Sequence, residues 1–201
     1  MSENRQYFSK TNNVLPSNEK IIHAKINEES FKFKTDNGVF SKDFLDFASK
    51  LLLEKMDFDS IIDGAILDVG CGYGPIGIYL SHVTKKEVVM LDINPRALEL
   101  SKANLILNNV NASFLESDCL DMVLNEKFAC VITNPPIHAG KEVVYKIYDQ
   151  SYEVLIEGGS LWIVIQEKHG APSSIKKLQT LFPKVEVFYK KKGFYILKCI
   201  K

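Results

Sequence analysis

Residues 65–77 read Ala-Ile-Leu-Asp-Val-Gly-Cys-Gly-Tyr-Gly-Pro-Ile-Gly, an apolar run that leads directly into a group of glycines. The first five residues predict a short buried strand, and the apolar residues after Pro75 predict the start of a helix. Between the two, Gly70, Gly72 and Gly74 permit backbone angles that other residues avoid, so the chain can turn closely beneath a ligand. This order of strand, glycines and helix predicts a ligand-binding floor at the carboxyl end of a strand.

The glycine spacing alone leaves the ligand open. Gly72, Gly74 and Gly77 match the G-x-G-x-x-G fingerprint of dinucleotide-binding proteins, and Asp92 lies about 20 residues further on, where that motif has its acid. However, Asp68 stands two residues before the first glycine, at a position where a dehydrogenase usually has an apolar residue. An acidic residue there resembles the first motif of S-adenosylmethionine (SAM)-dependent methyltransferases.

Length and composition indicate one cytoplasmic globular domain. The chain has 201 residues, of which 46% are hydrophobic and 25% charged. No apolar run approaches the ~18 residues of a membrane span, and the N-terminus lacks the pattern of a signal peptide. The four cysteines have no C-x-x-C spacing, so we expect reduced thiols, no bound metal and no membrane contact.

The formal net charge of zero conceals an asymmetry along the chain. Residues 160–201 contain nine lysines and only Glu167 and Glu186, a net charge of +7, so the first 159 residues carry −7. A basic end can bind nucleic-acid phosphates, although charge alone favours a solvated lysine face.

The N-terminal part of the chain predicts a short β extension over residues 1–40. Residues 1–20 are polar without periodicity and are expected to be loosely held, whereas residues 21–27 and 30–34 predict two strands. Ser41 is the predicted N-cap of a following helix, at the start of the main domain, residues 41–201.

Strands and helices alternate through the main domain. Helices are expected after Asn94, from Lys141 to a stop at Gly158-Gly159, and from Pro172 to about Leu181. The predicted strands are residues 65–69, 87–92, 112–117, 129–133, 161–165, 185–189 and 194–200. This alternation predicts an α/β fold: a doubly wound, mostly parallel, seven-stranded Rossmann-like sheet with an antiparallel strand in the closing hairpin.

Acidic residues stand in or directly after three predicted strands. Asp92 can accept two hydrogen bonds from ribose hydroxyls, and Asp118 can accept from an adenine amine with Cys119 donating or packing nearby. Asp68 would hold the glycine loop or the amino acid end of a cofactor. A single such acid is more often part of a turn, but three around one glycine floor predict a cofactor site. The predicted cofactor-binding residues are Asp68, Gly70, Cys71, Gly72, Gly74, Asp92, Ile93, Asn94, Asp118 and Cys119.

The sequence Asn134-Pro135-Pro136-Ile137 follows the fourth predicted strand. Prolines lack a backbone donor, so this turn is expected to leave its carbonyls free to accept, and Asn134 adds a side-chain carbonyl. Converging acceptors suit a substrate –NH2 group whose lone pair must face an electrophile. A rigid exit turn is the alternative, but after a SAM-type glycine loop we predict that Asn134, Pro135 and Pro136 are catalytic.

With these residues, the chain resembles class I SAM-dependent methyltransferases of the N-P-P-aromatic group, which methylate planar –NH2 nitrogens. Three stretches narrow the resemblance to ribosomal small-subunit (16S) rRNA guanine-N2 methyltransferases: Asp36-Asn-Gly-Val-Phe-Ser41, Asn134-Pro-Pro-Ile-His-Ala-Gly-Lys141 and Lys192-Gly-Phe-Tyr-Ile-Leu197. The match covers residues 36–201. It implies methyl transfer from SAM to the 2-amino group of a guanine, with rRNA or the small ribosomal subunit as partner.

Two departures from the family pattern bear on the substrate. Ile137 replaces the usual aromatic residue and cannot stack on a base, so Phe40, Phe194 or Tyr195 would have to supply a ring. Longer family members have two related domains, and this chain corresponds to the second, which leaves a compensating homodimer open. The residues that the resemblance implies for substrate binding are Phe40, Ile137, His138, Lys141 and Phe194.

Two of these residues also suit a role that involves neither catalysis nor substrate binding. A histidine like His138 is more often structural than catalytic, and Lys141 suits a solvated helix position as well as a phosphate contact. The alternative functions are methylation of an adenine 6-amino group or a protein glutamine amide, a non-catalytic RNA-binding module of the same fold, and a nicotinamide dehydrogenase.

Overall fold

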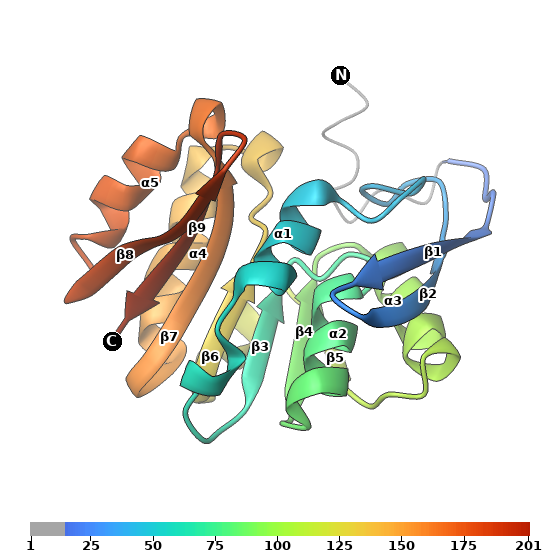
Figure 1. Cartoon of the computed structure of the whole chain (residues 1–201), viewed down its shortest axis with the longest axis horizontal. Helices are drawn as coiled ribbons and strands as arrows, with labels where there is room; N and C mark the ends of the chain where they lie inside the picture. Colours follow the sequence, from blue (N-terminus) through green and yellow to red (C-terminus); the bar gives the residue numbers. More distant parts are fainter. Residues whose placement is uncertain (1–14) are drawn as a thin grey trace.

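A computed structural model describes residues 15–201 as a three-layer α/β structure (Figure 1). Its main sheet has seven strands in the order β5-β4-β3-β6-β7-β9-β8. The strands are β3 (Ile66–Val69), β4 (Val88–Asp92), β5 (Ser113–Glu116), β6 (Phe128–Thr133), β7 (Leu155–Gln166), β8 (Lys184–Lys191) and β9 (Phe194–Ile200). The first five pair in parallel, and β9 is antiparallel to both β7 and β8. The predicted doubly wound sheet with its antiparallel strand is therefore confirmed.

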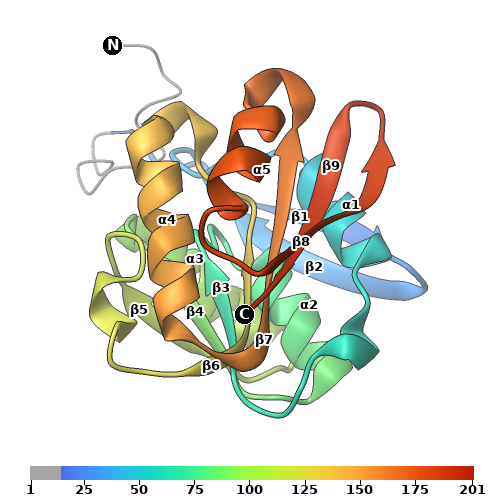
Figure 2. The ribbon, with the colours of Figure 1, turned by 90° about the vertical axis from the view of Figure 1, so that its left-hand side faces the viewer.

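Helices cover both faces of the sheet. They are α1 (Phe47–Lys55), α2 (Pro75–Thr84), α3 (Pro95–Leu107), α4 (Lys141–Val154) and α5 (Ala171–Leu178). Neighbouring residues of a strand point to opposite faces: Ile66 packs in the core with α1, α2 and α3, whereas Leu67 packs in the core with α4 and α5. Figure 2 shows α4 on one side of the sheet and α1 and α2 on the other. Burial on both faces explains why the inner strands read as continuous apolar runs.

The predicted N-terminal strands form a separate antiparallel hairpin, β1 (Lys20–Ile26) and β2 (Glu29–Thr35), beside α3 (Figure 1). Asn104 of α3 and Asn108 at its C-cap bond to the edge of β2 as a neighbouring strand would. The Asn104 side chain accepts from Lys34 N at 2.6 Å and donates to Lys34 O at 2.9 Å, and Asn108 binds both backbone groups of Lys32. These amides satisfy the free edge of β2 and attach the hairpin to the main domain.

Two local expectations are corrected. Helix α1 begins at Phe47 with Asp46 as N-cap, whereas the expected cap, Ser41, has a φ of 55° and donates to Phe44 O at 2.7 Å. Helix α4 ends at Val154, and the two glycines expected to stop it lie within β7. A Cβ on Gly159 would come 2.8 Å from Ile156 O, so close backbone packing rather than helix termination requires glycine there.

The expectation of a loosely held segment over residues 1–20 falls partly outside the described residues, which begin at Leu15. For residues 15–20 it is wrong, because this segment makes specific hydrogen bonds and enters β1 at Lys20. Leu15 O accepts from Arg96 at 2.9 Å, and Ser17 Oγ donates to Asp36 at 3.0 Å.

Candidate active site

A cavity of about 510 Å³ opens at the carboxyl ends of β3, β4, β5 and β6. Its volume is within the range of small-molecule sites. It is lined by Val39, Phe40, Ser41, Asp46, Ser49, Val69, Gly70, Cys71, Gly72, Tyr73, Pro75, Ile76, Leu91, Asp92, Ile93, Asn94, Ala97, Ser117, Asp118, Cys119, Asn134, Pro136, His138, Ala139, Val143 and Ile147. The glycine turn, the strand-end acids of β4 and β5 and the Asn-Pro-Pro turn therefore share one site.

The predicted glycine floor is present. The backbone N–H groups of Gly70 and Cys71 both donate to Leu91 O, at 2.8 and 2.9 Å, which ties the turn to β4. Gly72 has a φ of 59°, and a Cβ built on it would meet nothing within 4 Å, so the backbone angle and not crowding favours glycine. At Gly77 a Cβ would lie 2.4 Å from Met90 Sδ, so this glycine allows α2 to pack against the sheet.

Asp92 joins the floor to the turn before α3. Its Oδ2 accepts from Gly72 N at 2.7 Å and its Oδ1 from Asn94 N at 2.8 Å. Burial raises the pKa of Asp92 to about 6, so the group is a carboxylate at neutral pH. A carboxylate has about four acceptor positions. The backbone N–H of Ile93 also bonds to this group, and the remaining acceptor capacity is left for ligand hydroxyls. This arrangement fits the predicted ribose contact.

Asp68 lies behind the floor and does not line the cavity. It is fully buried, and its Oδ2 accepts from Gly77 N at 2.8 Å. Within residues 15–201 its Oδ1 has no hydrogen-bond partner. Burial, with the charge of Asp92 as a smaller cause, raises the pKa of Asp68 to about 8. Asp68 therefore holds the first turn of α2.

Asp118 and Cys119 lie in the turn after β5 and both line the cavity. Cys119 Sγ donates to Asp118 Oδ1 at 3.3 Å. Burial, together with this carboxylate, raises the pKa of Cys119 to about 12, so the thiol is neutral. Helix α4 fixes the turn, because Gln150 Oε1 accepts from Leu120 N at 2.9 Å and Lys146 Nζ lies 3.6 Å from Asp118 Oδ1.

Asn134 follows β6 and is oriented by α1. Its Nδ2 donates to Asp46 Oδ2 and to Ser49 Oγ, both at 3.0 Å. A carboxylate only accepts, so Nδ2 must face Asp46 and Oδ1 must face away. Among the residues that the structure describes, no donor contacts Oδ1, although Asn134 lines the cavity. The predicted substrate acceptor is therefore fixed in direction.

The two prolines are less free than expected. Pro135 O accepts from Ile137 N at 2.8 Å and Pro136 O from Ala139 N at 2.9 Å, within the single turn Ile137–Ala139. The expectation that both carbonyls are left free is therefore wrong, although each oxygen keeps a second lone pair. Pro136 lines the cavity, whereas Pro135 is buried beside it.

Of the residues that the resemblance implies for substrate binding, Phe40 and His138 line the cavity. Ile137 packs into the core beneath α4, and the Phe194 ring contacts the Phe47 ring at 5.3 Å. The Lys141 ammonium lies 5.0 Å from the centre of the Tyr145 ring. None of these three lines the cavity, and neither do Gly74 and Tyr195. Phe40 is thus the only one of the proposed ring donors on the cavity wall.

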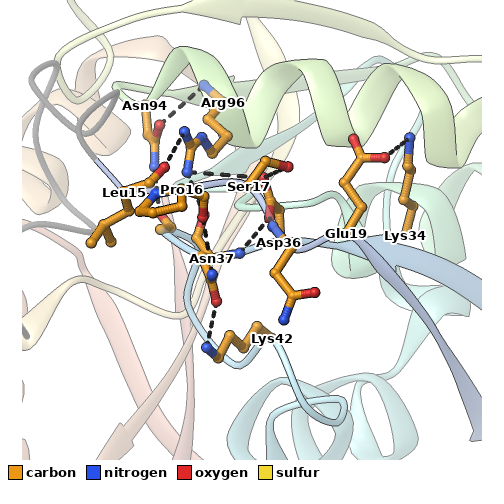
Figure 3. Close-up of polar contacts among 12 residues, drawn as sticks. Leu15, Pro16, Ser17, Glu19, Lys34, Asp36, Asn37, Lys42, Asn94 and Arg96 are labelled. Carbon is orange, nitrogen blue, oxygen red and sulfur yellow. Dashed lines mark hydrogen bonds and ion pairs between the residues drawn. The ribbon is translucent and has the colours of Figure 1, made fainter.

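The loop that carries Phe40 is held down by the start of α3 (Figure 3). Arg96 donates through Nη1 to Asn37 O at 2.7 Å and through Nη2 to Leu15 O at 2.9 Å. Asn94, which lines the cavity, donates to Gly38 O at 3.1 Å. The Arg96 guanidinium therefore connects Leu15 to the loop before α1, and Asn94 connects the same loop to the cavity wall.

Asp36 is buried beside Arg96 and accepts hydrogen bonds from both of the joined segments (Figure 3). Its carboxylate accepts from Asn18 N at 2.5 Å, Ser17 Oγ at 3.0 Å and Asn37 N at 2.7 Å. Burial opposes ionisation, but these hydrogen bonds and the nearby Arg96 outweigh it and lower the pKa of Asp36. The loop is therefore fixed by a charged group over the working pH range.

Several residues that line the cavity were not predicted from the sequence. Tyr73, Pro75 and Ile76 belong to the predicted floor and could have been included. Asp46 and Ser49 could not, because their role depends on contact with a residue more than 80 positions away.

A doubly wound sheet whose glycine turn, strand-end carboxylates and Asn-Pro-Pro turn meet in one cavity is the architecture of a SAM-dependent methyltransferase. The family model described as methyltransferase small domain matches residues 30–198, and the chain belongs to that family. The predicted family is confirmed, and SAM is the cofactor that its fold accommodates. Within residues 15–201 no helix is both long and apolar enough to cross a membrane, and no cluster of potential metal ligands is found.

The chain is similar to an uncharacterized protein over its whole length and to part of a named rRNA methyltransferase. The chain is 46% identical over its whole length to the uncharacterized protein YbxB of Bacillus subtilis. It is 36% identical over 138 residues to ribosomal RNA small subunit methyltransferase C of Hamiltonella defensa, a match that covers 66% of this chain and 40% of that protein.

Among solved structures, the chain is similar to the T. thermophilus 16S rRNA N2 G1207 methyltransferase (RsmC) in complex with AdoMet and guanosine. The TM-score is 0.82 at 26% sequence identity, and the match covers 93% of this chain and 52% of that one. The chain thus spans about half the length, or less, of the named rRNA methyltransferases that it matches.

Proposed function

We propose that the protein transfers the methyl group of SAM to the 2-amino group of a guanine in small-subunit rRNA. The observation that carries this proposal is the side chain of Asn134, which is locked by Asp46 and Ser49 with its carbonyl oxygen uncommitted at the cavity. The names of the methyltransferase C relatives and of the RsmC structure support the substrate.

The cofactor side of the cavity fits SAM. Asp92 keeps acceptor capacity for the ribose hydroxyls beside its backbone hydrogen bonds, and Asp118 offers a carboxylate to the adenine amine. Gly70 and Gly72 leave open space above the floor. When bound, SAM supplies an electrophilic methyl carbon on its sulfonium.

Asn134 would act on the amine of the substrate. The lone pair of this amine is delocalised into the base, which makes the amine a poor nucleophile. An acceptor on its N–H binds more strongly as the nitrogen becomes tetrahedral and positive, so Asn134 Oδ1 stabilises the transition state more than the ground state. The remaining lone pair of Pro135 O is the proposed second acceptor. The methylated nitrogen loses its extra proton to water, so no strong base is required.

Positioning would supply most of the rate enhancement. Holding two partners in line is worth up to ~7–11 kcal/mol. Phe40, on the cavity wall, is the proposed apolar contact for the base in place of the aromatic residue absent at position 137. Cytoplasmic location and action on rRNA belong to the same proposal.

The test is methyl transfer from labelled SAM to small-subunit rRNA and to small ribosomal subunits, followed by nucleoside analysis. We expect label in N2-methylguanosine, and none with Asn134→Ala although this variant binds SAM with unchanged affinity. Label in N6-methyladenosine or in protein would contradict the proposed substrate. Equal loss of SAM binding and turnover in Asn134→Ala would contradict the assigned role.

A further inference from the structure

We infer that the rim of the cavity, defined here as Phe44, Phe47, Phe194, Lys168, Lys191 and Lys192, binds single-stranded RNA that flanks the target base. The inference rests on the proposed function and extends it to a surface outside the cavity. None of these six residues lines the cavity itself.

Exposed aromatic rings are concentrated at this place. Among the large hydrophobic residues exposed within residues 15–201, the only phenylalanines are Phe40, Phe44 and Phe47, at 46%, 69% and 42% exposure. All three lie within residues 40–47, a segment in which Phe40, Ser41 and Asp46 line the cavity. The other exposed apolar side chains are aliphatic or methionine. Exposed rings are costly in water, and their flat faces are the surfaces on which unpaired bases stack.

Phe47 and Phe194 form a pair next to the proposed acceptor. Their ring centroids are 5.3 Å apart at an interplanar angle of 58°. Phe47 directly follows Asp46, which holds Asn134. Phe194 pairs in the sheet with Gln166 at the carboxyl end of β7, and Figure 2 shows the β8–β9 turn beside α1. A nucleotide adjacent to a base in the cavity would therefore meet this pair.

Within the described residues, three lysines without ion-pair partners lie in or next to the turn that joins β8 and β9, and one of them contacts a rim ring. Lys192 Nζ is 5.9 Å from the centre of the Phe47 ring. Glu167 N donates to Gly193 O at 2.7 Å, which places Lys168 next to the Lys191-Lys192 turn. Within the described part of the chain, Glu167 pairs with Lys190 at 3.6 Å, and none of Lys168, Lys191 and Lys192 forms an ion pair. Three ammonium groups therefore remain for phosphates.

This combination fits a single strand better than a duplex or an acidic protein surface. In a duplex the bases are stacked on one another and their faces are covered, so the rings would contact only sugar and phosphate. An acidic protein surface would use the lysines but not the rings. A guanine amine can reach Asn134 only when its base is unstacked, which also requires single-stranded character at the target.

The test measures binding without turnover, by fluorescence anisotropy with a labelled single-stranded oligonucleotide of small-subunit rRNA sequence and with the same oligonucleotide in a duplex. Phe47→Leu keeps an apolar side chain but removes the ring, and we expect about tenfold weaker binding of the single strand. The double variant Lys191→Gln/Lys192→Gln should reduce the slope of log affinity against log salt by about 1.4.

The controls are Ile106→Ala, which alters an exposed apolar residue on α3, and Lys85→Gln/Lys102→Gln, which removes two exposed lysines elsewhere. Both should bind the oligonucleotide like the wild type. SAM affinity by calorimetry should be unchanged in every variant, which shows that the proteins are folded. The lysine variant lies in an exposed turn and keeps the inference testable if Phe47→Leu does not fold.

Unchanged affinity and salt slope in the rim variants, equal binding of the duplex, or no binding of RNA by the wild type would overturn the inference. The proposed function can fail separately. If the rim variants lose single-strand binding but the wild type forms no N2-methylguanosine, RNA binding at the rim is supported and the proposed substrate is wrong. If the variants methylate RNA and bind it like the wild type, the proposed function is supported and RNA binding at the rim is wrong.

Discussion

Asn134 and Asp46 are 88 residues apart in the sequence and meet at the edge of the cavity. Asp46 has two tasks, since the same Oδ2 that orients Asn134 accepts from Ser49 N at 2.8 Å and caps α1. The residues of the glycine floor and of the Asn-Pro-Pro turn could be predicted from sequence because their chemistry depends on local backbone requirements. The orientation of Asn134 could not, because it depends on a contact that only the folded chain creates.

Asp46→Asn separates the two tasks of this residue. Asparagine is as good an N-cap as aspartate, so the free energy of unfolding should change by less than about 0.5 kcal/mol. An amide can also donate, however, so it no longer determines which end of Asn134 faces the substrate. We expect kcat to fall roughly tenfold with an unchanged Kd for SAM. The control is Asp57→Asn, at an exposed cap without a side-chain hydrogen bond. Wild-type kcat in Asp46→Asn would contradict the positioning role.

Asp68 predicts a pH dependence of stability. Its pKa is about 8 in the folded protein and 3.8 without the surrounding structure, so the folded state binds the proton more tightly. This group therefore stabilises the fold most at low pH, and stability declines as the pH rises from about 4 through about 8. Asp92 has a pKa of about 6 in the folded protein, so its own effect on the pH dependence of stability is largely complete by about pH 6. Between pH 6 and 8 the wild type should lose about 1–2 kcal/mol more than Asp68→Asn, measured by urea unfolding. Parallel pH profiles would refute this.

At the scale of elements, alternation of strands and helices was predictable, because the inner strands contain short apolar runs and most helices begin at a cap or proline. Boundaries were less predictable. The N-cap of α1 is Asp46 and not the predicted Ser41, because the segment between them forms part of the cavity wall. The junction of α4 and β7 lies before Gly158 because Leu155 already pairs with Phe128 of β6. Tertiary contacts decide both positions.

The attachment of the N-terminal hairpin to α3 can be tested through Asn104 of that helix and Asn108 at its C-cap. Asn104 is fully buried and bonds to both backbone groups of Lys34 and to Tyr73 O at 2.9 Å. Asn104→Ala should lower the free energy of unfolding by about 2–4 kcal/mol, because it leaves buried backbone groups unpaired. Asn108→Ala removes partly exposed bonds that water can replace, and should cost under about 1 kcal/mol. Equal losses in urea unfolding would mean that the hairpin is not held by the buried amide.

At the scale of the whole molecule, the carboxyl edge of the sheet carries the cofactor floor, the proposed acceptor and the aromatic and basic rim. The positive net charge of residues 160–201 is explained in part, since Lys168, Lys191 and Lys192 lie at this edge. Sequence alone could place these lysines on one stretch but could not place Lys192 beside Phe47, because the turn between β8 and β9 meets α1 only in the folded sheet. In the proposed function, this edge binds both the target base and the RNA that flanks it.

The most direct measurement of the central claim is a crystal structure with S-adenosylhomocysteine and guanosine bound. The account predicts the ribose of the cofactor product on Asp92 and the guanine 2-amino nitrogen within ~3.2 Å of Asn134 Oδ1. A guanosine bound with its amine beyond hydrogen-bonding reach of Asn134, or a cofactor product away from the glycine floor, would contradict it.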